Sequence, residues 1–192
     1  MTNAELSLNT KRALATALKK IMETKTLSKI TVSELIRECN VNRKTFYYHF
    51  EDIYALLKWM LEQEAFEVVK NFNWVDSTED AFRFVMNYVD ENKHIINCAY
   101  DSMGYEEMMR FLYNDFYDIV RNNIEINAKS LSLDVDESFK DFLTKFFTNA
   151  IAGILIEWTK NKLSQDREIV LQDLMTICTV SIPEILKTKY RN

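Results

Sequence analysis

Residues 31–50, TVSELIRECNVNRKTFYYHF, hold the side chains of this chain that are best suited to bind a nucleic acid. Arg43 and Lys44 are followed by hydroxyl and aromatic side chains at helical spacing. Either basic side chain can donate hydrogen bonds to guanine O6 and N7 in the major groove. The hydroxyl groups can hold phosphate oxygens and so fix the position of a protein on a duplex. The pattern therefore predicts a helix that lies on double-stranded DNA.

Two short helices joined by a tight turn must position these side chains. Thr31 with Glu34 forms a capping box, which predicts the start of a helix at 32–39. Asn40 tolerates the left-handed conformation that ends helices, and Asn42 is a plausible N-cap for a second helix at 42–49. The buried stripe expected for the first helix is Val32, Leu35 and Ile36.

The second helix has two faces of different character. Phe46 and Phe50 are four residues apart and are expected to point to the core. The free N–H groups and partial positive charge at the start of the helix suit a phosphate. A purely structural alternative is that Tyr47, Tyr48 and His49 cover a small helical core.

The segment VNRKTFYYHFEDIYALL resembles the helix-turn-helix and following helix of the TetR family of bacterial transcriptional regulators. The resemblance covers about residues 8–57. It implies an all-α homodimer with three N-terminal DNA-binding helices and a variable C-terminal domain that binds an effector and the partner subunit. It places base contacts on Arg43 and Lys44. The whole expected DNA-binding set is Thr31, Asn42, Arg43, Lys44, Thr45, Tyr47, Tyr48 and His49.

The chain departs from the family pattern at the start of the next helix. The family usually has a phosphate-binding lysine there, whereas this chain has Ile53 after Glu51 and Asp52. The family also often has glycine at the turn, where this chain has Asn40. One contact to the DNA backbone is therefore expected to be missing.

Composition favours a helical protein with a sizeable core. Apolar residues make up 47% of the 192 residues, and only two glycines and one proline occur. A β-rich chain needs turn residues at short intervals, so this scarcity predicts long helices. We expect an all-α fold of about nine helices, with a DNA-binding domain at 1–52 and a regulatory and dimerisation domain at 53–192. Beyond the two short helices, the expected ranges are 8–24, 52–71, 78–91, 92–100, 105–127, 138–160 and 167–189.

Charge is distributed unevenly along the chain. The net charge is −5, but residues 1–50 carry nine basic and four acidic side chains. The remainder carries a net charge of −10. A basic N-terminal part on an acidic body suits a protein that meets DNA at one end.

Little in the sequence indicates a cofactor, a metal site or a membrane. Cys39, Cys98 and Cys178 are widely spaced and form no CxxC pair, so each is read as a small buried hydrophobic residue. The N-terminus is too polar for a signal peptide, and no run approaches 18 apolar residues. We expect a cytoplasmic protein without a metal, a cofactor or a membrane contact.

The predicted helix at 138–160 is apolar nearly all round, so it must be buried on more than one side. A second copy of the chain is the natural cover for one side, and a central helix in a monomer is the alternative. Pro183 is expected to disturb the last helix. The expected dimer interface is Phe139, Phe146, Ala150, Ile151, Gly153, Ile154, Leu171, Leu174, Met175, Cys178 and Ile182.

The family resemblance also implies an effector pocket between the helices of the body. Glu157 stands between Ile156 and Trp158, so it would need a partner or a cationic ligand if it were buried. The helix at 52–71 belongs to both parts and is the expected path for a signal. The candidate pocket wall is Met60, Phe84, Tyr88, Tyr100, Phe111, Phe116, Glu157 and Trp158.

An enzyme is not expected, because a glycine-rich phosphate loop and a Gly-x-Ser-x-Gly elbow are both missing from the sequence. We expect the protein to be a repressor that binds a palindromic operator as a homodimer. A small-molecule effector bound in the C-terminal domain is expected to control it. The alternative is an activator or co-regulator controlled by a partner protein.

Overall fold

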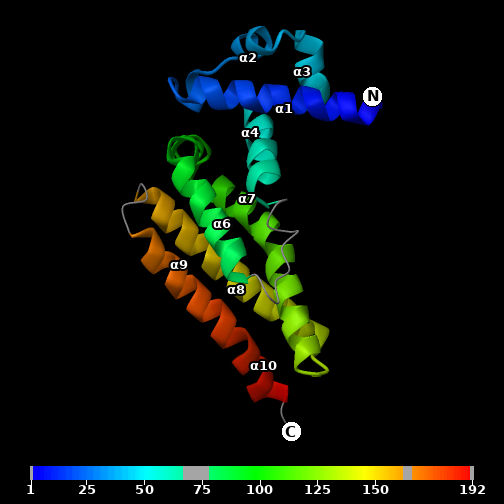
Figure 1. Cartoon of the computed structure of the whole chain (residues 1–192), viewed down its shortest axis with the longest axis vertical. Coiled ribbons are helices and arrows are strands. Elements are labelled where there is room, and N and C mark those ends of the chain that lie inside the picture. The colour runs from blue at the N-terminus through cyan, green and yellow to red at the C-terminus, as the bar shows by residue number, and fades with distance from the viewer. Residues whose placement is uncertain (1, 67–77, 162–165, 191–192) are drawn as a thin grey trace.

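The structure, a computed structural model, describes residues 2–66, 78–161 and 166–190, and every regular element within them is helical (Figure 1). Three helices form the head, which we define as residues 2–50. The head carries α1 (Asn3–Met22), the short 3₁₀ turn η1 (Leu27–Lys29), α2 (Val32–Cys39) and α3 (Arg43–His49). The predicted all-α class with a three-helix head is confirmed.

Local capping sets the bounds of the head helices. α1 begins five residues before the predicted start, because Thr2 and Glu5 form a capping box. The predicted capping box of Thr31 with Glu34 opens α2. Asn40 ends α2 in the left-handed conformation, with φ 53° and ψ 42°, as expected.

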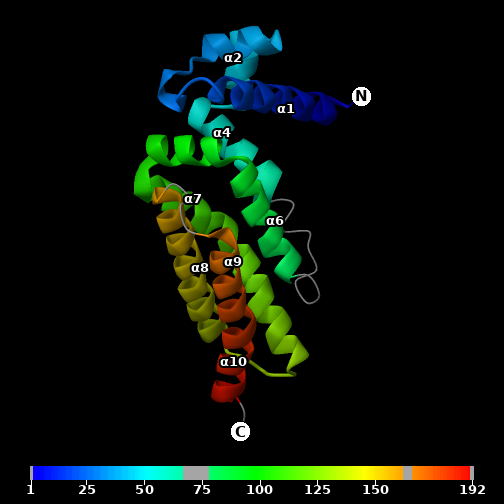
Figure 2. The same cartoon turned by 60° about the vertical axis from the view of Figure 1, so that its left-hand side comes forward.

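One helix leaves the head and enters the rest of the molecule (Figures 1 and 2). α4 (Ile53–Leu61) begins at the N-cap Asp52, whose carboxylate accepts from the backbone N–H of Ala55 at 2.8 Å. It continues directly into the π-helical segment η2 (Glu62–Phe66). The predicted continuation to residue 71 lies outside the described residues, as does the loop that follows it.

The body, which we define as residues 78–190, is a bundle of long helices below the head (Figure 1). Its core joins that of the head through α4, where Leu56, Leu57 and Met60 have no exposed surface. α7 and α8 lie side by side along much of their length. The body elements are α6 (Thr78–Glu91), α7 (Lys93–Ser130), α8 (Glu137–Lys160), α9 (Arg167–Thr176), the π-helical η3 (Ile177–Ser181) and α10 (Ile182–Tyr190).

Two of the predicted helix boundaries need correction. The helices expected at 92–100 and 105–127 are one long element, α7, with a kink at Gly104, whose φ is 74° and ψ is 176°. The helix expected at 167–189 is continuous in space but contains η3 just before Pro183. Proline lacks an N–H and its ring meets the carbonyl four residues earlier, so a local departure from α geometry relieves both problems.

Candidate DNA-binding and effector sites

α3 is the last helix of the head, and Asn42 caps its N-terminus. The side-chain oxygen Oδ1 of Asn42 accepts from the backbone N–H of Thr45 at 2.8 Å and from the Thr45 hydroxyl at 3.0 Å. Phe46 is fully buried and Phe50 nearly so, with ring centroids 6.2 Å apart. The apolar face of α3 thus anchors the helix, and its other face is turned to solvent.

The basic side chains at the start of α3 are accessible. Arg43 and Lys44 are both exposed. The guanidinium of Arg43 makes long contacts with the Ser33 hydroxyl, at 3.5 Å, and the Tyr47 hydroxyl, at 3.4 Å. Hydrogen bonds of this length are weak, so Arg43 is free to exchange them for a base edge.

The aromatic residues at the end of α3 differ in accessibility. Tyr48 is 82% exposed and Tyr47 is 49% exposed, so both hydroxyl groups can reach a phosphate. His49 is half-buried, and burial together with the nearby charge of Lys11 lowers the pKa of its imidazole. A neutral histidine can still donate one hydrogen bond.

Thr31 and Ile53 lie outside α3, and their side chains are less available for contacts with DNA. The Thr31 hydroxyl is engaged in its capping box, where it lies 2.9 Å from Glu34 Oε2. Ile53 opens α4, is half-buried and packs against the core. An isoleucine at this position adds to packing and gives a phosphate no charged partner.

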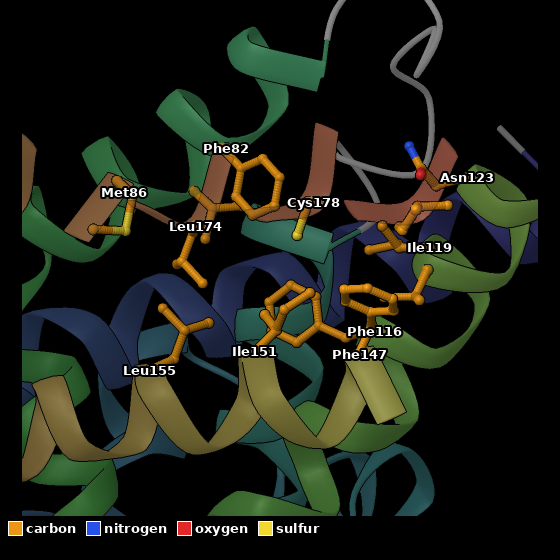
Figure 3. A pocket seen from close by; sticks show the side chains of 13 residues that line it. Phe82, Met86, Phe116, Ile119, Asn123, Phe147, Ile151, Leu155, Leu174 and Cys178 are labelled. Atoms are coloured by element: carbon orange, nitrogen blue, oxygen red, sulfur yellow. The ribbon is translucent and has the colours of Figure 1, made fainter. Parts of the chain in front are cut away.

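The body contains a first apolar cavity between α6, α7, α8 and the last helices (Figure 3). Its volume is about 40 Å³. Asn123 provides the polar group at one end, and Phe116 and Phe147 point into it. The lining residues are Phe82, Val85, Met86, Phe116, Ile119, Val120, Asn123, Phe147, Ile151, Leu155, Leu174, Cys178 and Ile182.

A second cavity of about 60 Å³ lies nearer the head. Val85, Phe116 and Leu155 line both cavities and so form the wall between them. The residues that line this second cavity and carry polar side-chain groups are Tyr88, Trp158 and Thr159. The lining residues are Leu61, Ala65, Val85, Tyr88, Val89, Ile96, Met108, Phe111, Leu112, Phe116, Leu155, Trp158 and Thr159.

Half of the candidate pocket wall lies at these cavities. Tyr88, Phe111, Phe116 and Trp158 line the second cavity, and Phe116 also lines the first. The assignment of Glu157 to a pocket wall is wrong, because its side chain is 57% exposed and pairs with Lys160 at 3.3 Å. The candidates that line neither cavity are Met60, Phe84 and Tyr100.

Most of the cavity lining was not identified from sequence. Phe82, Val85, Met86 and Ile119 look like ordinary core positions, since an apolar side chain at helical spacing gives no sign of an unfilled space beside it. Asn123 gave no local signal either, because its neighbour Asn122 is also polar.

The predicted dimer residues divide between two faces. The apolar pattern alone could not separate these faces, because α8 and α9 each carry apolar residues on both sides. Phe146, Ala150 and Ile154 are exposed, and Phe139, Gly153 and Met175 are partly exposed. The remaining ones are buried within a single protomer, so their assignment to the interface is corrected: Ile151, Leu171, Leu174, Cys178 and Ile182.

The exposed apolar side chains of the last helices form one outer face, which we call the apolar face. Phe142 and Phe146, one turn apart on α8, are 61% and 58% exposed. Ile154 continues the same row on α8. Ile169 from α9 and Ile177 from η3 are also exposed and line a groove with Ile154. Large apolar side chains gathered on one face mark a surface that binds another molecule.

Among the described residues, one helical stretch is long and apolar enough to cross a membrane by length and composition, Arg167–Tyr190. Only 28% of its most apolar window is buried. Its inward residues, such as Leu171 and Leu174, pack in the body, and its outward residues belong to the apolar face. The stretch is therefore apolar on two sides, because one side packs in the body and the other belongs to the apolar face.

Comparison with known proteins gives matches over both parts of the chain. A family model described as bacterial regulatory proteins of the tetR family matches residues 14–60. A second model, described as a transcriptional regulator C-terminal region, matches residues 76–179, which is more than half of the chain.

One curated relative and one solved structure agree with these family matches. The HTH-type dhaKLM operon transcriptional activator DhaS of Lactococcus lactis subsp. lactis (strain IL1403) is 26% identical over 91 residues. That match spans 47% of this chain and about half, 49%, of the relative. The solved structure of a dihydroxyacetone kinase operon activator DhaS has a TM-score of 0.73 at 19% identity, covering 92% of this chain and 97% of that one, a likeness of fold. On the two family models together, the chain belongs to the TetR family of bacterial transcriptional regulators.

Proposed function

We propose that this TetR-type regulator binds a palindromic operator as a homodimer through α3 and is controlled by an effector that acts on the body. The observation that carries the proposal is the exposed basic start of α3, where Arg43 and Lys44 project from a helix held by the Asn42 cap and the buried Phe46. A recognition helix contacts base edges with its N-terminal residues. We divide the chain functionally at residues 52 and 53, with α4 joining the two parts.

The apolar face supports the homodimer. Two copies of the row Phe142, Phe146 and Ile154 can cover each other about a two-fold axis, as a self-complementary interface requires. The contribution of α9 and η3 extends the row across a second helix, and a stable interface buries about 1,200–2,000 Å² in total. A two-fold axis also places two recognition helices on the two halves of a palindrome.

The direction of regulation is best supported as activation. The curated relative and the solved structure are both named as operon activators. Repression, which the family resemblance led us to expect, is the second candidate. Expression from a reporter that carries the operator decides between them, because loss of an activator lowers the signal and loss of a repressor raises it.

The cavities support the body as the place where the effector acts. Their volumes of about 40 and 60 Å³ are far below the 300–1,000 Å³ of an ordinary ligand pocket. A small-molecule effector must therefore be small and largely apolar, or must merge the cavities by moving Phe116. The small volumes are also compatible with the alternative, control by a partner protein. We expect the regulator to act in the cytoplasm, where its DNA lies.

Selection of binding sites from a random pool of duplexes tests the DNA-binding proposal. The purified protein should enrich a sequence with two-fold symmetry. It should bind that duplex at least about a thousandfold more tightly than a scrambled one at the same salt concentration. Enrichment of no common sequence would overturn the proposal of specific recognition.

A further inference from the structure

Three side chains from three separate elements meet at one carboxylate oxygen. Glu64 Oε2 accepts from Lys19 Nζ at 2.8 Å and from the Tyr88 hydroxyl at 3.0 Å. Lys19 lies on α1 in the head, Glu64 on η2 and Tyr88 on α6 in the body. Lys19 Nζ is also 5.8 Å from the centroid of the Tyr88 ring. This group therefore joins the DNA-binding head to the body.

The same group borders the second cavity. Tyr88 and Ala65 both line that cavity, and Ala65 directly follows Glu64 in η2. A molecule that enlarges the cavity must displace one of its walls, and Tyr88 is a wall whose hydroxyl holds Glu64. The side chain of Tyr88 thus links the occupancy of the second cavity to the position of the Glu64 carboxylate.

The backbone of Glu64 is in a conformation that can change. π-helical segments are rare, appear mostly as single-turn bulges inside α-helices and are frequent at functional sites. Here the segment follows α4 directly, so a return to α geometry would turn Glu64 about the helix axis relative to α4. The hydrogen bonds from Lys19 and Tyr88 favour the observed position.

We propose that Glu64 couples the second cavity to the DNA-binding head. While Tyr88 donates to Glu64, the carboxylate stays in place to hold Lys19 and so fixes the angle of α1. When a small apolar ligand in the second cavity displaces Tyr88, Glu64 is released and α1 changes its angle relative to α4. This inference rests on the proposed function, in which the angle of the head sets operator affinity.

Two other contacts attach α4 and the head to the body without involving the cavities, and they would act as the fixed points of this movement. Lys58 on α4 pairs with Glu107 on α7 at 3.1 Å. The backbone N–H of Leu27 in η1 donates to Cys98 Sγ on α7 at 3.1 Å. Neither pair includes a residue that lines the first or the second cavity.

Removal of one hydroxyl tests the coupling. Tyr88→Phe deletes the hydrogen bond to Glu64 and keeps the ring in the cavity wall. Tyr117→Phe is the matched control, because the Tyr117 hydroxyl donates to a carboxylate, that of Asp141, at 2.8 Å within the body. With the selected duplex, Tyr88→Phe should change the operator Kd at least about fivefold, and Tyr117→Phe less than about twofold. Equal effects of the two variants would overturn the coupling.

A double-mutant cycle tests whether Lys19 and Tyr88 act through the same carboxylate. Lys19→Gln should change Kd in the same direction as Tyr88→Phe, and the double variant should go no further than the larger single change. Lys20→Gln controls for loss of charge on α1, since Lys20 pairs with Glu38 inside the head. Additive effects of Lys19→Gln and Tyr88→Phe would overturn the coupling.

Hydrogen exchange separates a failure of this inference from a failure of DNA recognition. In the absence of DNA, Tyr88→Phe should speed amide exchange at the end of α1 and in η2, whereas Tyr117→Phe should leave both unchanged. If the protein selects no duplex but exchange changes as expected, the proposed function fails and the coupling stands. Unchanged exchange in Tyr88→Phe would overturn the coupling.

Discussion

Arg43 donates from Nη2 to the hydroxyl of Tyr47, one turn further along α3, at 3.4 Å, and its guanidinium lies 5.7 Å from the centroid of the Tyr47 ring. The side chain best placed to read a base therefore rests on its own helix when no DNA is bound. Because the contact is long, its loss on binding costs little. The aromatic ring limits the range of conformations from which Arg43 reaches a base.

Arg43→Ala and Lys44→Ala should each weaken operator binding by about 1–3 kcal/mol and relax the base preference at one position in each half-site. Fluorescence anisotropy with single-base variants of the selected duplex measures both effects. Arg110→Ala is the control, since Arg110 is an exposed arginine of the body that pairs with Glu107. A preserved preference in both head variants would mean that bases are read elsewhere.

Tyr48→Phe should weaken binding to all duplexes by a similar factor, because a hydroxyl on a phosphate carries no base information. Tyr48 is 82% exposed, so its removal leaves the fold unchanged. Tyr105→Phe, on an exposed tyrosine of α7, is the matched control. Binding that weakens only for the selected duplex would contradict a backbone contact.

Ile53→Lys should raise affinity for every duplex and steepen the salt dependence by about one released counterion per head. The side chain of Ile53 is half-buried, so the lysine must extend its head group to the surface while its stem replaces the apolar contact. Binding isotherms at several salt concentrations give the slope. An unchanged slope would show that residue 53 lies away from the phosphates.

Phe146→Glu should convert the homodimer into folded monomers and abolish operator binding, since it places a charge in the apolar face. Ile151→Glu is an informative comparison. Ile151 is only 5% exposed, and a charge there should unfold the protomer itself. Sedimentation and circular dichroism together distinguish the two outcomes. A Phe146→Glu variant that remains dimeric would place the interface on another surface.

The capping box of α2 should make the head sensitive to acid. A hydrogen bond from Lys25, followed by the bonds of Thr31, lowers the pKa of Glu34 from 4.5 to about 2. A depressed folded pKa means that the stabilisation is complete above about pH 4.5 and is lost as pH falls towards 2. Glu34→Gln should lower the melting temperature at neutral pH and match the wild type near pH 2. Glu106→Gln, on the exposed surface of α7, controls for loss of a carboxylate.

The parts of the fold that depend on neighbouring residues were predictable from the sequence. Thr31, Asn40, Asn42 and Asp52 each act on backbone groups a few residues away, so their residue type and spacing suffice to place the start or end of a helix. The apolar pattern does not reveal the start of α1, because Ala4, Leu6 and Leu8 alternate with polar residues and do not follow the helical period.

Features that depend on distant parts of the chain could not be predicted in the same way. Ile151 and Ile154 are both apolar and lie on the same helix, but Ile151 is buried beside the first cavity and Ile154 is 40% exposed. Only the packing of the helices decides between them. The meeting of Lys19, Glu64 and Tyr88 likewise depends on three elements and on an unpredicted π segment.

The π segment η3 holds one residue more than an α-helix over the same path, so deleting one residue within 177–181 would restore an uninterrupted α-helix. A deletion from a regular α-helix would turn everything after it by about 100°. Here the extra residue is already accommodated by the π segment, so the deletion would leave Ile182 and Leu186 facing the body. It would also return Pro183 to a regular helix that it disrupts. Relatives of this chain can therefore lose one residue here and keep the packing of everything after it, provided that they also lose the proline.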